Sequence, residues 1–162
     1  MMTNHNLISS FELDSLLNPI LGYHSCILGL FDFYKSNAVV VEGKIQNWEK
    51  MNDIDILNNI NIWKYKFNDV IIVNDSTIIN NEAFYVKKEK LSDFVTNYLS
   101  DYGECFFNSD IFFIPVGIGK IISFNHDGYK LNYNLPVELT SDGFKKYNDL
   151  IINKAREKNS ER

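Results

Sequence analysis

CFFNSDIFFIPVGIGKIISFNHDGYKLNY, residues 105–133, is the stretch that decides the fold of this chain. Ile111–Pro115 and residues 120–125 are apolar, β-branched and aromatic runs of the kind that form strands. His126-Asp127-Gly128 follows and leads into a third run at 129–133. An Asp-Gly pair between such runs predicts a hairpin with a type I′ turn, in which both central residues take positive φ. We therefore expect a sheet built from hairpins.

Shorter strand-like runs precede this region. Residues 60–67 alternate, with Trp63, Tyr65 and Phe67 on one face, which predicts a half-exposed antiparallel strand. The polar, acidic stretch 46–59 is expected to be a long loop or a frayed helical turn. The remaining runs are 25–34 and 38–45, which we expect to pair as a hairpin, 70–73 and 77–79, which flank a turn at Asn74-Asp75, and 83–86.

Helical signals separate and follow these runs. Apolar residues at i, i+3, i+4, i+7 and i+8 predict a helix over 91–99 that includes Leu99 on its buried stripe, with Gly103 just past the end. Two further helices are expected: one at 10–17 after the capping box Ser9-x-x-Glu12, and one starting at Thr140 or Ser141 with Phe144, Tyr147 and Ile151 inward.

Strands joined by turns rather than by helical crossovers predict an α+β fold. We expect a mostly antiparallel β-sheet of about six to eight strands, with about three helices packed on one side. A chain of 162 residues is long enough for one domain with a full core, so residues 1–162 are interpreted as a single domain. Its ends, 1–8 and 156–162, are expected to be flexible.

The balance of charge argues about partners. The chain carries 21 acidic and 16 basic side chains, a net charge of −5. Proteins that bind DNA or RNA usually have an excess of Lys and Arg on one face, so direct nucleic-acid binding is disfavoured. An acidic surface suits a basic protein partner, chiefly by speeding their encounter.

The compartment follows from what the sequence lacks. Residues 1–6 have neither the basic region nor the apolar core of a signal peptide, and no apolar run approaches the ~20 residues that span a bilayer. The two cysteines, Cys26 and Cys105, lie far apart in apolar surroundings, where a free thiol packs as a small hydrophobe. The sequence predicts a reduced, cytoplasmic protein with no membrane association.

No motif predicts catalysis, a metal or a cofactor. The segment 116–120 contains GxGK, but it lacks the leading Gly and the following Ser or Thr of a phosphate loop, and a strand follows it. No His or Cys pair has zinc-ligand spacing. His24 or His126 could pair with Cys26 or Cys105 as base and thiol nucleophile. That arrangement would form only in three dimensions, so a small cytosolic enzyme remains the alternative.

Two acidic loops that also carry aromatic residues are the candidate partner-binding sites. Aromatic anchors ringed by complementary charge are typical of protein interfaces. An ordinary solvated acid is the better explanation for any single residue, so the hypothesis concerns the patch as a whole. The candidate residues are Trp48, Glu49, Asp53 and Asp55 in one loop, and Asp101, Tyr102, Glu104 and Asp110 in the other.

Taken as a whole, the chain resembles the small immunity proteins encoded beside bacterial polymorphic toxins, such as those of contact-dependent growth inhibition systems. The resemblance lies in size, acidic character and Asn/Ile/Phe/Tyr-rich strands, and in a helix at 91–99 that leads into 106–113 and 124–128. It implies a toxin inhibitor that binds a cognate toxin domain, commonly a basic nuclease, and occludes its active site in the producing cell. A non-catalytic adaptor of a mobile element fits the same composition.

Overall fold

The computed structural model describes residues 6–9, 39–80, 82–118 and 120–134. In this part of the chain seven strands form one sheet of order β1-β4-β3-β5-β6-β7-β2, and every neighbouring pair is antiparallel. The expected α+β fold is confirmed. The strands are β1 (Asn6–Ser9), β2 (Val39–Lys44), β3 (Asp69–Val73), β4 (Glu82–Lys87), β5 (Ile111–Pro115), β6 (Lys120–Phe124) and β7 (Tyr129–Asn134).

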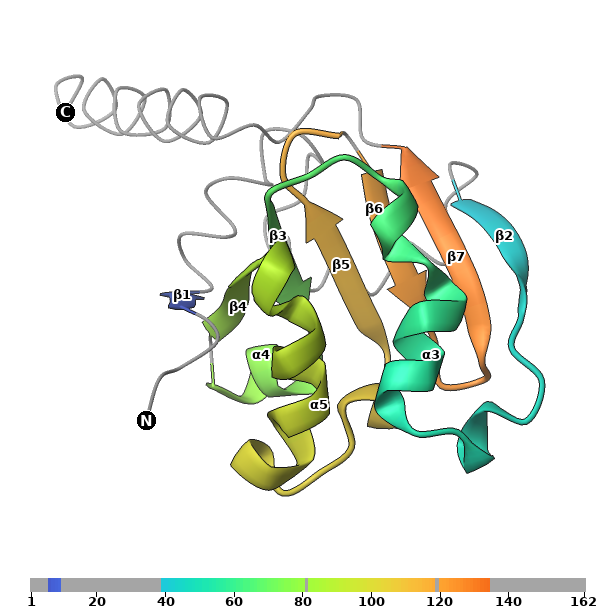
Figure 1. The fold of residues 1–162 in the computed structure, drawn as a ribbon, viewed down its shortest axis with the longest axis horizontal. Coiled ribbons are helices and arrows are strands. Elements are labelled where there is room, and N and C mark those ends of the chain that lie inside the picture. Colours follow the sequence, from blue (N-terminus) through green and yellow to red (C-terminus); the bar gives the residue numbers. More distant parts are fainter. Residues whose placement is uncertain (1–5, 10–38, 81, 119, 135–162) are drawn as a thin grey trace, which may run out of the picture.

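Helices cover one face of this sheet. The α-helices of the described residues are α3 (Asp53–Ile60), α4 (Asp75–Asn80) and α5 (Leu91–Tyr102). Figure 1 shows α3 and α5 running antiparallel, side by side, in front of the sheet. Short 3-10 turns flank them: η2 (Trp48–Lys50), η3 (Ile62–Lys64), η4 (Lys88–Lys90) and η5 (Phe106–Asn108).

The core lies between the helices and the sheet, and it is rich in aromatic rings. Ile56, Leu57 and Ile60 of α3 and Leu91, Phe94, Val95 and Tyr98 of α5 pack on alternate residues of β3, β5 and β6. The intervening residues of the central strands, such as Phe112 and Ile121, are fully buried as well. Burial on both faces is why these strands read as continuous apolar runs rather than as alternating ones.

The hairpins at 105–133 are confirmed, but the β6–β7 turn is not of type I′. Only Gly128 takes positive φ, 88°, in the three-residue connection 126–128. The Gly128 N–H donates to the Asn125 carbonyl at 2.9 Å, and the Asn125 N–H donates to the Tyr129 carbonyl at 3.1 Å. The Asn125 side chain also accepts from the N–H groups of Asp127 and Tyr129. This side chain stabilises a longer turn with a single left-handed glycine.

The strand predicted at 60–67 is wrong. Asn61 takes positive φ, 55°, and ends α3, after which η3 begins. The N–H groups of Lys64 and Tyr65 donate to carbonyls three residues earlier, so this backbone forms turns instead of a ladder. Ile62 and Phe67, which the alternation would place on opposite faces of a strand, are both buried where the chain passes from α3 to β3.

The predictions for 46–59 and 77–79 are also wrong, because both contain helices. Asn52 caps α3 by accepting the Asp55 N–H at 3.0 Å. Asn74 caps α4 by accepting the Thr77 N–H at 3.3 Å, while the Thr77 hydroxyl accepts the Asn74 N–H at 3.1 Å. The first of these helices buries an apolar stripe on the core, so it is more than a frayed turn.

The helix predicted at 91–99 is confirmed as α5, with one correction. Gly103 takes φ 77° and its N–H donates to the Leu99 carbonyl, as a left-handed helix end requires. Leu99, expected on the buried stripe, is 52% exposed. Strands at 70–73 and 83–86 are confirmed as β3 and β4. Several predictions lie outside the described residues: the helices at 10–17 and after 140, and the strand-like run at 25–34. The ends that were expected to be flexible also lie outside them, except for residues 6–8.

Candidate binding surface

The segments that carry the predicted site residues, which are η2, the start of α3, the end of α5 and the chain before β5, lie at one end of the fold, the lower end in Figure 1. The two acidic loops converge there because α3 begins, α5 ends and β5 starts at this end. The register Val73 opposite Phe112 and Ile111 opposite Phe124 brings the end of β3 and the β6–β7 turn beside them. We call this surface the acidic end; its carboxylates are Glu49, Asp53, Asp55, Asp75, Asp101, Glu104, Asp110 and Asp127.

Asp53 is the residue that joins the two loops. One oxygen of its carboxylate accepts the Phe106 N–H at 2.8 Å, and the other accepts the Phe107 N–H at 3.3 Å. It therefore links the first turn of α3 to η5, 53 residues further along the chain. Sequence analysis placed Asp53 among the partner-binding residues, but its carboxylate is engaged inside the fold.

Replacing Asp53 with alanine is expected to lower the free energy of unfolding by about 2–3 kcal/mol, because two half-buried backbone N–H groups lose a charged acceptor. Asp55→Ala is the matched control, since that exposed side chain lies on the same helix and should change stability by about 0.5 kcal/mol or less. Urea unfolding followed by circular dichroism measures both. Equal losses from the two substitutions would contradict the role of Asp53.

Asp110 is also engaged within the fold. Its Oδ1 accepts the backbone N–H of His126 at 2.9 Å and lies 3.0 Å from His126 Nδ1. This hydrogen bond and the charge of Asp110, with a further contribution from Asp127, raise the pKa of His126 above its ordinary value. A protonated His126 places one positive charge among the carboxylates of the acidic end. The imidazole is mostly exposed and fixes the position of the β6–β7 turn.

Trp48 is a support rather than a free anchor. Its ring meets Phe124 edge-on, with centroids 5.4 Å apart, and lies directly against Gly128. The side chain is half-buried, so η2 is held on the β6–β7 hairpin. A large part of the indole is therefore unavailable to a partner.

Tyr102 presents more of its ring to solvent. It is 42% exposed and stacks on Tyr98, with ring centroids 4.6 Å apart. Partial burial is the main cause that raises the pKa of its hydroxyl, and the neighbouring Tyr98 and the carboxylate of Asp101 add to it. Tyr102 therefore remains a neutral, rigid ring on the surface at physiological pH, a property typical of interface anchors.

A groove between α3 and α5 opens beside these side chains. Its volume is about 320 Å³, and it is lined by Met51, Asn52, Asp53, Ile54, Thr96, Leu99 and Cys105. Asp53 is the carboxylate among these lining residues, while Asp55 follows Ile54 and Glu104 precedes Cys105 in the sequence. Cys105 is exposed, contrary to the packed thiol expected from the sequence.

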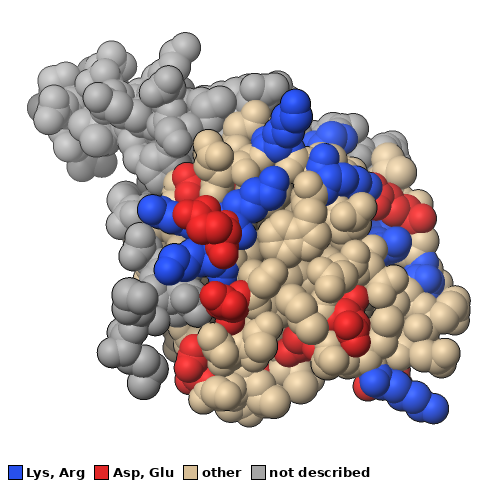
Figure 2. Space-filling model, viewed as in Figure 1, with Lys and Arg blue, Asp and Glu red and all other residues tan. Residues whose placement is uncertain are grey.

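The opposite end of the molecule is basic. Figure 2 shows most lysine side chains over the upper part of this face, with some acidic side chains among them, and mainly acidic side chains over its lower part. The lysines come from η3 and the loop after it, the turn between β4 and α5, and the start of β6. We call this surface the basic end; its lysines are Lys64, Lys66, Lys87, Lys88, Lys90 and Lys120.

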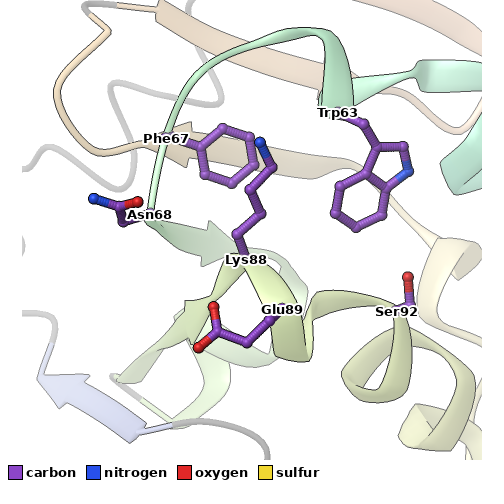
Figure 3. Close-up of a pocket in the computed structure, with 6 residues that line it drawn as sticks. All are labelled: Trp63, Phe67, Asn68, Lys88, Glu89 and Ser92. Atoms are coloured by element: carbon purple, nitrogen blue, oxygen red, sulfur yellow. The ribbon is translucent and has the colours of Figure 1, made fainter.

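A cavity of about 460 Å³ opens at the basic end, with Trp63, Phe67, Asn68, Lys88, Glu89 and Ser92 around it (Figure 3). Sequence reasoning missed this cavity because it interpreted 60–67 as a strand. It also missed the groove, although Asn52 and Asp55 at capping spacing before Ile56, Leu57 and Ile60 are a usable signal for α3.

The structure describes only part of the alternative enzyme site. His24 and Cys26 lie outside the described residues. His126 is at the β6–β7 turn and Cys105 at the end of the groove. Within the described ranges, no three His, Cys, Asp or Glu side chains are grouped to hold a metal ion. None of the helices in that part of the chain is long and apolar enough to cross a membrane.

No known protein family, no curated protein and no solved structure matches this chain.

Proposed function

We propose that this protein is a cytoplasmic inhibitor that binds a basic protein toxin through its acidic end and occludes the toxin's active site. The observation that carries the proposal is convergence: the acidic segments at the start of α3 and at the end of α5 flank one apolar groove. Charge of one sign around an apolar centre is the arrangement by which protein interfaces combine fast encounter with stable burial.

Within this surface the residues have different roles. Asp53, Asp110 and Trp48 hold the loops in place through contacts inside the fold. The exposed carboxylates Glu49, Asp55, Asp101 and Glu104 remain available to pair with Lys or Arg of a partner. Tyr102 and Leu99 supply exposed apolar area beside them. Carboxylates so presented would substitute for the phosphates that a nuclease active site binds.

The partner is sought in the product of the neighbouring upstream gene. We expect the two proteins to co-purify, and co-expression to abolish the toxicity of that product. A non-toxic neighbour, or one that this chain does not neutralise, would contradict the proposal.

Charge-neutralising variants test which end binds. Asp101→Asn with Glu104→Gln should lower the association rate about three- to tenfold at low ionic strength, and the difference should shrink as salt screens the surface. Stopped-flow association measured across a salt series gives both quantities. Glu89→Gln with Asp93→Asn removes the same charge near the start of α5 and should change the rate less than about twofold. Equal effects from the two pairs would place the interface elsewhere.

A further inference from the structure

In the part of the chain that the structure describes, the two ends differ in charge. At the basic end the neighbouring acids are Glu42, Asp69, Glu89 and Asp93. Glu42 lies 3.8 Å from the ammonium of Lys64, and Asp69 accepts the Tyr85 hydroxyl at 3.0 Å. That hydrogen bond accompanies a pKa of Tyr85 raised to about 12, chiefly by burial. The six lysines thus outnumber the four acids, and two of the four acids, Glu42 and Asp69, are already engaged.

The cavity at this end combines aromatic faces with one directed cation. Trp63 donates its ring N–H to Asn58 Oδ1 at 3.3 Å, which fixes the indole. Lys88 Nζ lies 4.7 Å from the centre of the Phe67 ring and donates to the Tyr65 carbonyl at 3.1 Å. One of the three N–H donors of the ammonium is used in that bond.

The side chains of the cavity face a common space. Figure 3 shows Trp63 on one side and the Lys88–Phe67 pair on the other, with the Ser92 hydroxyl directed toward Trp63. The carboxylate of Glu89 points to the far side of Lys88, away from Trp63. A ligand between these walls would meet an aromatic face, an ammonium and a hydroxyl, and no carboxylate in front of it.

We propose that this cavity binds a nucleotide, with the base stacked on Trp63 and the phosphate paired with Lys88 and Ser92. The volume of about 460 Å³ is within the range of small-molecule sites. Aromatic side chains stack on any base, and a lysine ammonium pairs with phosphate as a point charge. An inorganic phosphate would leave the aromatic walls unused, and a neutral ring would leave the ammonium unused. The site is at the other end from the groove, so it stands independently of the proposed inhibitor role.

Calorimetric titration of the full chain with AMP, adenosine and inorganic phosphate tests the assignment. AMP is expected to bind saturably. Adenosine and phosphate should each bind at least about tenfold more weakly than AMP, because each offers half of the recognised chemistry. Lys88→Met should lower the affinity for AMP about tenfold and leave adenosine unchanged. Lys130→Met, on β7, is the control and should alter neither. Circular dichroism establishes that each variant is folded.

A second readout locates the ligand. The chain has two tryptophans, so in Trp48→Phe the fluorescence reports on Trp63 alone, and AMP should quench it. If Lys88→Met does not fold, the comparison of AMP with adenosine in the wild-type chain still tests whether the phosphate contributes to binding. Equal affinity for AMP and adenosine, no saturable binding of AMP, or binding without quenching of Trp63 would overturn the proposal. If a 5′-phosphorylated dinucleotide binds more tightly than AMP, the site recognises the 5′ ends of nucleic-acid strands. If it binds more weakly, the site recognises free nucleotides.

Discussion

Replacing Phe106 with alanine is expected to lower the free energy of unfolding by about 3–5 kcal/mol, the typical loss for a buried phenyl ring. Phe106 is 2% exposed and lies where η5 enters the core. Its ring contacts those of Phe94, Tyr98, Phe107 and Phe113, with centroids 4.8–6.0 Å apart. The truncation removes apolar area and leaves a cavity between α5 and β5.

The loss is large because such a domain is stable by only about 5–15 kcal/mol in total. Leu99→Ala is the control. That side chain is half-exposed in the last turn of α5, and its truncation should change stability by about 0.5 kcal/mol. Urea unfolding of both variants measures the difference. A loss below about 1 kcal/mol for Phe106→Ala would mean that the aromatic core is packed differently.

Gly128→Ala is expected to lower the free energy of unfolding by about 2–4 kcal/mol, the sum of backbone strain and overpacking. Gly128 has φ +88°, which L side chains rarely adopt. A Cβ atom there would also lie 2.3 Å from Cδ1 of Trp48. The indole would have to move, and its edge-on contact with Phe124 would be lost.

Gly103→Ala separates the two contributions. Gly103 has a similar φ of +77°, but nothing lies within 4 Å of the added Cβ, so only the strain of about 1–2 kcal/mol applies. Thermal and urea unfolding of the two variants give the comparison. Tryptophan fluorescence should shift in Gly128→Ala alone. Equal losses with no such shift would refute the contact between Trp48 and the hairpin.

The local sequence predicted elements where propensity and burial agree. In β5, β6 and α5 the pattern of apolar residues matches the element that forms. It failed at 60–67, because Asn61 takes positive φ and ends α3, and both Ile62 and Phe67 are buried although a strand would place them on opposite faces. It failed at 77–79 because Ile79 is 76% exposed, so β-branched character there reflects no sheet packing.

The candidate site was predictable in its residues but not in its roles. Acidic and aromatic side chains in two loops are visible in the sequence, and the segments that carry all eight lie at one end. Which of them are free depends on contacts across more than fifty residues, such as Asp53 with Phe106. Leu99 belongs to the candidate surface because it lines the groove between α3 and α5. The helical periodicity of the sequence does not specify that α3 leaves this groove open.

By itself, the sequence determined the class of fold, the central hairpins and the long helix, because turn chemistry and side-chain periodicity act over a few neighbouring residues. The tertiary structure alone decided that carboxylates and lysines separate to opposite ends, that Asp53 and Trp48 serve the fold, and that Trp63 faces Lys88 across a cavity. These outcomes depend on strand order and helix placement, which bring distant residues together through burial that no local pattern encodes.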